Sequence, residues 1–83
     1  MSSMKTVSIH YYAVFREQRG LSSESRVTGA RTLRELYAEL KSAHGFSLPL
    51  ERVQVAVGDE FADWDADVVE NCAVVFIPPV AGG

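Results

Sequence analysis

Thr32-Leu-Arg-Glu-Leu-Tyr-Ala-Glu-Leu-Lys-Ser-Ala-His-Gly45 is the part of this chain whose structure its sequence predicts most clearly. Its apolar residues recur at the spacing of one helix face: Leu33, Leu36, Tyr37 and Leu40. This spacing predicts an amphipathic helix with one buried stripe. Thr32 and Glu35 form a capping box, in which the Thr32 hydroxyl accepts from the Glu35 amide and the Glu35 carboxylate accepts from the Thr32 amide. Gly45 is a typical residue to end the helix.

Two strands are predicted before this helix. Residues 5–14 begin with an alternation of apolar and polar side chains, which indicates a strand buried on one face. The inward face would hold Val7, Ile9 and Tyr11, and the outward face Thr6, Ser8, His10 and Tyr12. Residues 24–28 predict a weaker strand that forms a hairpin with the first. Phe15 to Gly20 is charged and ends in glycine, so we expect a helical turn or a tight loop there.

Three strands are predicted after the helix. Residues 52–57 form the first, a turn follows at residues 58–60, and residues 61–64 form a short strand. Residues 73–77 are a continuous apolar run, which is typical of a central strand buried on both faces. Strand pairing would then stop at Pro78 and Pro79, because proline has no amide hydrogen.

The order strand, strand, helix, strand, short strand, strand predicts an α+β domain, with a mixed sheet packed against one main helix. It fits a β-grasp, the ubiquitin-like roll. We expect a flexible N-terminus at residues 1–4, the β-grasp domain at 5–78 and an extended tail at 79–83. A chain of 83 residues is one domain. It is too short for a deep substrate cavity, which favours a carrier, a binding module or a subunit over a self-contained enzyme.

Charge is distributed unevenly along the chain, whose net charge is −3. Residues 1–52 hold all eight basic and five acidic residues, whereas residues 53–83 hold six acidic and no basic ones. The acidic half argues against nucleic acid and suits a partner with a basic surface. No apolar run approaches a membrane span of roughly 18 residues, and the start lacks an apolar leader. The single Cys72 indicates no internal disulfide, so a reducing cytoplasm is expected.

The usual catalytic and metal-binding patterns are absent from the sequence. His10 and His44 lie on different predicted elements, and no CxxC or phosphate-binding glycine motif occurs. Residues 63–67 resemble the opening of a calcium loop, but Val68 and Val74 stand where a glycine and a bidentate glutamate are needed. Cys72 adjoins an apolar strand and is interpreted as packing. We therefore expect no metal site.

The C-terminal residues Phe76-Ile-Pro-Pro-Val-Ala-Gly-Gly83 are the strongest functional signal. A buried strand leads into a stiff Pro-Pro segment, which would project the following residues away from the sheet. Four residues beyond Pro79 span about 13–14 Å when extended, enough to enter another protein's active site. Gly82 and Gly83 lack a Cβ atom and can pass a narrow channel. The reacting group would be the α-carboxylate of Gly83.

These residues, together with Tyr12-Ala-Val-Phe-Arg-Glu17 and Val55-Ala-Val57, resemble the small subunits of molybdopterin synthase. Those proteins are MoaD-type sulfur carriers of the ubiquitin-like ThiS family. The resemblance implies that an E1-like adenylyltransferase uses ATP and magnesium to adenylate Gly83, and that a sulfur donor converts it to a thiocarboxylate. The large subunit, which would hold the catalytic residues, then passes the sulfur to cyclic pyranopterin monophosphate. This chain itself would bind no cofactor.

The resemblance also implies contacts with partner proteins. Tyr12, Phe61 and Ile77 match apolar docking positions, and Arg16 matches a charged one. The tail residues would bind inside the partner: Pro78, Pro79, Val80 and Ala81, followed by Gly82 and Gly83. Purely structural roles are the alternatives, with Tyr12 covering neighbouring strands, Phe61 anchoring a loop and Ile77 lying in the core.

Three other functions stay open at this point. The first is a sulfur carrier for cysteine, thiamine or tRNA thiolation, with the same chemistry at Gly83. The second is a ubiquitin-like modifier that is joined to lysines through Gly83. The third is an interaction module whose tail has no role, in which case removing Gly82 and Gly83 would leave its function unchanged.

Overall fold

The computed structural model describes residues 4–79 of the chain. Its elements follow in the order β1 (Lys5–Tyr11), α1 (Val14–Arg19), β2 (Ser23–Thr28), α2 (Leu33–His44), the 3₁₀ helix η1 (Leu50–Arg52), β3 (Gln54–Val57), β4 (Glu60–Ala62) and β5 (Ala73–Ile77). The predicted domain, residues 5–78, lies inside the described range. The predictions for residues 1–3 and 80–83 lie outside the described residues.

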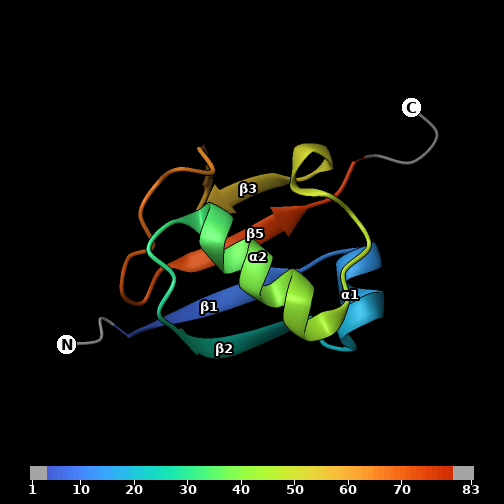
Figure 1. Ribbon diagram of the computed structural model, residues 1–83, viewed down its shortest axis with the longest axis horizontal. Coiled ribbons are helices and arrows are strands. Elements are labelled where there is room, and N and C mark those ends of the chain that lie inside the picture. Colours follow the sequence, from blue (N-terminus) through green and yellow to red (C-terminus); the bar gives the residue numbers. More distant parts are fainter. Residues whose placement is uncertain (1–3, 80–83) are drawn as a thin grey trace.

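The strands form one mixed sheet in the order β2-β1-β5-β3-β4, in which only β1 and β5 run parallel. Helix α2 crosses one face of this sheet, and no helix of residues 4–79 covers the other face (Figure 1). The α+β class, the mixed sheet with one main helix and the β-grasp order are confirmed. Among the described residues, no helix is long and apolar enough to cross a membrane.

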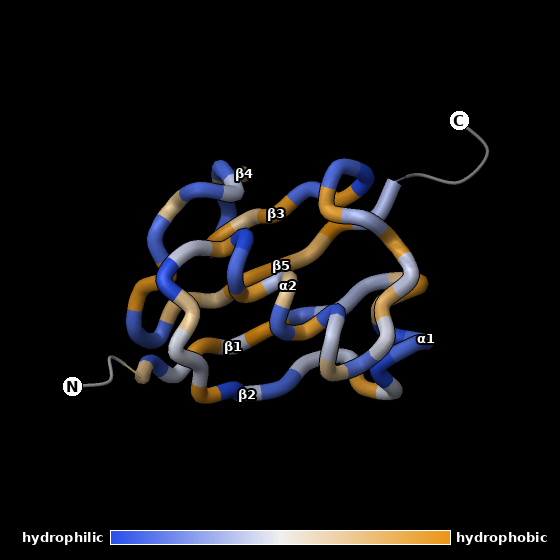
Figure 2. The backbone as a smooth tube through the Cα atoms, in the orientation of Figure 1, coloured by the Kyte–Doolittle hydropathy of each residue, from blue (hydrophilic) through white to orange (hydrophobic). Residues whose placement is uncertain are grey.

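The core lies between α2 and the sheet. It takes the predicted helix stripe and the inward faces of β1 and β5, all almost fully buried: Leu33, Leu36, Tyr37, Leu40, Val7, Ile9, Tyr11, Val74 and Phe76. Phe15 of α1 closes one end, with its ring 5.0 Å from that of Phe46. Figure 2 shows apolar residues along β3 and β5, whereas β2 is mostly polar. The expected alternation along β1 is confirmed.

Several boundaries differ from the predictions. The first strand ends at Tyr11 because α1 begins at Val14, and the hairpin strand begins at Ser23. The strand predicted from Arg52 begins at Gln54, because the Val53 amide donates to the Leu50 carbonyl oxygen in the turn of η1. The strand predicted over 61–64 is β4, Glu60–Ala62. Trp64 turns inward instead, and its indole N–H donates to the Val53 carbonyl at 3.2 Å.

The prediction that the strand at residues 73–77, now β5, is buried on both faces is wrong. Val74 and Phe76 are fully buried under α2, but Ala73, Val75 and Ile77 are only partly buried. The reason is that α2 covers one face of the sheet alone (Figure 1). The apolar run therefore supplies both a core face and a partly exposed apolar face.

Of the two hydrogen bonds predicted for the capping box of α2, one is confirmed and the other is wrong. The Glu35 amide donates to the Thr32 hydroxyl at 3.2 Å, as predicted. The Glu35 carboxylate accepts from the Arg31 amide at 2.8 Å and not from that of Thr32. The chain before α2 is paired with another segment through a bridge between Thr32 and Asp67, and in this arrangement the Arg31 amide is the one that reaches the Glu35 carboxylate. Gly45 ends the helix in the left-handed conformation, with φ 70°.

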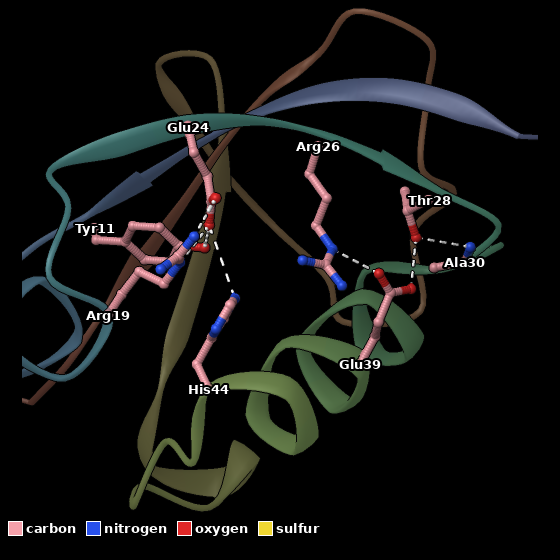
Figure 3. A network of polar contacts seen from close by, with 8 residues as sticks. All are labelled: Tyr11, Arg19, Glu24, Arg26, Thr28, Ala30, Glu39 and His44. Carbon is pink, nitrogen blue, oxygen red and sulfur yellow. Dashed lines mark hydrogen bonds and ion pairs between the residues drawn. The ribbon is translucent and has the colours of Figure 1, made fainter.

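A polar network ties β2 to the two helices (Figure 3). Glu24 accepts two hydrogen bonds from the Arg19 guanidinium, each 2.9 Å long, and one from the Tyr11 hydroxyl at 2.6 Å. The hydrogen bonds from Arg19 lower the pKa of Glu24 to about 2. Burial raises the pKa of Tyr11 and lowers that of His44, whose Nε2 lies 3.9 Å from Glu24.

Glu24 gives a stability that depends on pH. Its folded pKa lies below its ordinary value of 4.5, so the contribution is complete above about pH 4.5 and is lost as the pH falls toward about 2. Glu24→Gln should lower the free energy of unfolding by about 2 kcal/mol at neutral pH and by much less near pH 2. Urea unfolding at both pH values measures this. Glu17→Gln on the exposed side of α1 is the control, and a Glu24→Gln effect that is constant with pH would contradict the prediction.

Candidate functional site

The end of β5 is the point from which the predicted tail departs. Ile77 pairs with Gln54 of β3, and no strand pairing is recorded beyond it among the described residues. Pro78 is half-buried beside η1, in a groove of about 290 Å³ that is also lined by Glu51 and Arg52. Pro79 is exposed. The Pro78-Pro79 segment thus follows the central strand of the sheet and shares a groove with residues of η1. The predicted reactive and tail-binding residues beyond it, Val80, Ala81, Gly82 and Gly83, lie outside the described residues.

A hollow on the helix-free face of the sheet lies next to this point. It has a volume of about 450 Å³, and we call it the open-face hollow. Its lining is mostly apolar: Tyr12, Ala56, Gly58, Asp59, Phe61, Val75 and Ile77. Three of the four contacts implied by the resemblance, Tyr12, Phe61 and Ile77, are therefore brought together.

Strand register explains why the hollow forms. Ala56 of β3 pairs with Phe61 of β4 on one side and with Val75 of β5 on the other. The three side chains therefore form a row across the helix-free face, because paired residues project to the same side of a sheet. The small Ala56 side chain at the centre leaves a depression between two larger ones. Tyr12 follows the end of β1, beside β5.

The exposure of these apolar side chains shows which of them belong to the surface and which to the core. Phe61 is 72% exposed and Tyr12 54%, so neither anchors a loop or belongs to the core. Ile77 is half-buried on the helix-free face and is also not a core residue. Large apolar side chains gathered on an open surface are typical of a protein-binding site. Arg16 is exposed on α1 but does not line the hollow.

Other candidate residues take structural positions. Val68 and Val74, which interrupt the calcium-like pattern, are both buried in the core. Within residues 4–79, no group of three or more His, Cys, Asp or Glu side chains is placed to hold a metal ion. Cys72 is half-buried against the core, as interpreted from the sequence. His10 and His44 lie on β1 and α2 and form no pair.

Sequence reasoning missed Ala56 and Val75 as parts of the site. Val75 belongs to the strand that was predicted to be buried on both faces, and nothing in the sequence of residues 52–57 indicated which side chains of that strand face away from α2. The Gly58-Asp59 turn was the available signal. A tight hairpin at these two residues sets the register of β3 and β4, and that register places Phe61 opposite Ala56.

Comparison with known proteins shows the family of this chain. The model of the ThiS family matches residues 9–83, nearly the whole chain. The chain belongs to the ThiS family. No curated protein sequence matches it. Its fold is that of the sulfur carriers and ubiquitin-like modifiers.

Three solved structures illustrate the similarity. A candidate molybdopterin converting factor subunit 1 from Pyrococcus furiosus is 29% identical, with a TM-score of 0.74 over 92% of this chain and 99% of that one. The match to the Helicobacter pylori complex of subunits 1 and 2 of molybdopterin converting factor has 24% identity and a TM-score of 0.63, over 94% of this chain and 99% of that one. The match to small archaeal modifier protein 1 from Haloferax volcanii has 20% identity and a TM-score of 0.75, over 94% of this chain and 99% of that one. The last two matches show the fold alone.

The exposure of Phe61 leads to a stability prediction. Phe61→Ser should change the free energy of unfolding by no more than about 0.5 kcal/mol, because an exposed side chain contributes little to the fold. Phe15→Ala, which removes a fully buried ring from the core, should cost about 3–5 kcal/mol. Urea denaturation of both variants measures the contrast. A Phe61→Ser cost as large as that of Phe15→Ala would return Phe61 to the core.

Proposed function

We propose that this chain is the sulfur-carrier small subunit of a molybdopterin synthase and that its reacting group is the carboxylate of Gly83. The observation that carries the proposal is the path of β5. This central strand ends at Ile77, which lines the open-face hollow, so Pro78 and the residues that follow start where a partner would bind. The 29% identity with the Pyrococcus furiosus protein supports the molybdopterin branch of the ThiS family.

The first step takes place on an E1-like adenylyltransferase. A carboxylate oxygen of Gly83 attacks the α-phosphorus of ATP, and magnesium pyrophosphate leaves. The resulting mixed anhydride is a good electrophile, whereas a free carboxylate is a poor one. The outer sulfur of a persulfide donor then attacks the carbonyl carbon and AMP leaves, which gives an acyl disulfide. A thiol breaks the S–S bond of this intermediate by forming a new disulfide with the donor sulfur, and the Gly83 thiocarboxylate is released. This chain binds no cofactor in that step and serves only to present its carboxylate.

The second step takes place on the large subunit, which supplies the catalytic residues. Tyr12, Phe61 and Ile77 form the apolar docking surface, and Arg16 adds a charged contact. Pro78 and Pro79 limit the directions in which the chain can leave the sheet, because each proline fixes its own φ. The residues from Val80 to Gly82 carry the thiocarboxylate to cyclic pyranopterin monophosphate, which receives the sulfur. The Helicobacter pylori structure, a complex of subunits 1 and 2, supports such a partner.

Intact mass spectrometry tests the carrier chemistry. The chain is incubated with its activating enzyme, ATP, magnesium and a sulfur donor. We expect the mass increase of one sulfur replacing one oxygen, localised to Gly83, because the adenylate makes that carbonyl the site of sulfur attack. A reaction without ATP and a chain lacking Gly82 and Gly83 are the controls, and both should keep their mass.

The outcomes separate the competing functions. An unchanged mass with a demonstrably active activating enzyme would reject every sulfur-carrier function. Isopeptide-linked products at lysines would instead indicate a ubiquitin-like modifier. If the thiocarboxylate forms, adding the large subunit and cyclic pyranopterin monophosphate tests the pathway. Transfer of the sulfur to the pterin is expected, and its absence with an active large subunit would indicate another sulfur acceptor.

Docking through the open-face hollow is tested with a matched pair of charge substitutions. Phe61→Asp places a carboxylate in the apolar interface and should weaken binding to the large subunit by about 30-fold or more. Val69→Asp places the same charge on another exposed apolar residue, a valine that does not line the hollow, and should leave the affinity unchanged. Isothermal titration calorimetry measures both. Equal effects of the two variants would place the docking surface elsewhere.

A further inference from the structure

The edge strand β2 has one edge that is not paired with another strand of residues 4–79. In the sheet order β2 comes first and pairs only with β1, so its outer side has no strand partner among residues 4–79. The pairing with β1 runs without a bulge from Lys5 opposite Thr28 to His10 opposite Ser23. A straight, regular edge of this kind is a template for pairing with another strand.

Register identifies the backbone groups that are free. The Tyr11 amide donates to the Ser22 carbonyl at 2.8 Å, in line with the β1–β2 register, so this pair is a hydrogen-bonded one. Such pairs alternate along an antiparallel ladder. Ser23, Ser25 and Val27 therefore sit at the positions whose N–H and C=O groups point away from β1. All three side chains are exposed, Val27 by 58%.

Common protections of an edge are missing on this side. β2 contains no proline, and its helix-free face carries no charge, only Ser23, Ser25 and Val27. The charged residues of the strand, Glu24 and Arg26, alternate with them and turn to the side of α2. There they bond to Arg19 and Glu39 (Figure 3).

We propose that β2 pairs antiparallel with β2 of a second copy of this chain, about a two-fold axis at Ser25, and so joins two sheets into one. In this register Ser25 faces Ser25 of the second copy, and Ser23 faces its Val27. Glu24 then lies opposite Arg26 of the second copy, and Arg26 lies opposite its Glu24. Opposite charges directly across two strands stabilise the pairing.

Neighbouring registers are unfavourable. Hydrogen-bonded pairs across the new contact must join residues whose backbone groups point outward, so the register can move only in steps of two. Placing Ser25 opposite Ser23 brings Glu24 against Glu24 of the second copy. Placing Ser25 opposite Val27 brings Arg26 against Arg26. Like charges directly opposite destabilise a strand pair, so the register centred on Ser25 is the self-complementary one.

The two charged side chains have capacity left for this contact. Arg26 uses its Nε for Glu39, and its guanidinium carries four further N–H donors. The side chains of Arg26 and Glu24 keep 25% and 15% of their surface exposed. The contact also leaves the open-face hollow free. The hollow lies across β5, β3 and β4, toward the edge of the sheet opposite to β2. The proposal is thus independent of the proposed function.

Cysteine cross-linking tests the register. In a Cys72→Ser background, Ser25→Cys places two thiols on residues whose Cα atoms are about 5.5 Å apart across the axis, within disulfide range. Ser23→Cys is the matched control, because its two copies are four residues out of register, about 13 Å apart. Under mild oxidation we expect disulfide-linked dimers of Ser25→Cys only. Equal cross-linking of both variants, or of neither, would overturn the proposal.

Sedimentation equilibrium tests the association itself. The unmodified chain should show a reversible monomer–dimer equilibrium that weakens as salt screens the charge pairs. Ser25→Pro removes an outward amide hydrogen at an edge position where proline is tolerated, and should shift the chain to monomer. Ser25→Ala keeps that hydrogen and should dimerise as before. A chain that stays monomeric up to about 1 mM, a generous limit for a small interface, would overturn the proposal.

Discussion

Parallel pairing between β1 and β5 is the interaction on which the rest of this structure depends. It places the first and last strands of the chain side by side in the middle of the sheet, with the Ser8 amide bonded to the Cys72 carbonyl at 2.9 Å. The core forms because both strands turn alternate side chains toward α2. The site forms because the same pairing brings the end of β1, where Tyr12 follows, next to the end of β5, where Pro78 begins.

The two faces of β5 divide the work of the domain. Val74 and Phe76 hold the core, whereas Val75 and Ile77 line the open-face hollow. In the proposed carrier, a partner would therefore recognise the face of the strand from which the reacting tail departs. Recognition and delivery are then coupled by geometry, since Val75 and Ile77 of the docking surface belong to the strand that the tail follows in sequence. A chain of this size needs no cavity for substrate if the partner supplies one.

The sequence predicted what local periodicity determines. Helix α2, its burial stripe and its glycine end all follow from spacing within one segment, and the alternation of β1 follows in the same way. The burial of β5 was wrong because a continuous apolar run does not say how many faces of a sheet are covered. Phe61 was identified through the family resemblance, but its place in the hollow also depends on the pairing of Ala56 with Val75, which joins strands distant in sequence. The Arg31 amide replaced that of Thr32 in the cap for a similar reason, namely the bridge to Asp67.

The central position of β5 also has a mechanical consequence. Force applied to the chain beyond Pro79 would run along the axis of β5, while its hydrogen bonds to β1 and β3 lie across that axis on both sides. These bonds would be loaded in shear and would share the load, so that they break together and not one after another. In the proposed carrier, a partner that pulls on the tail would therefore load all of these hydrogen bonds at once, and β5 would resist the pull as a unit.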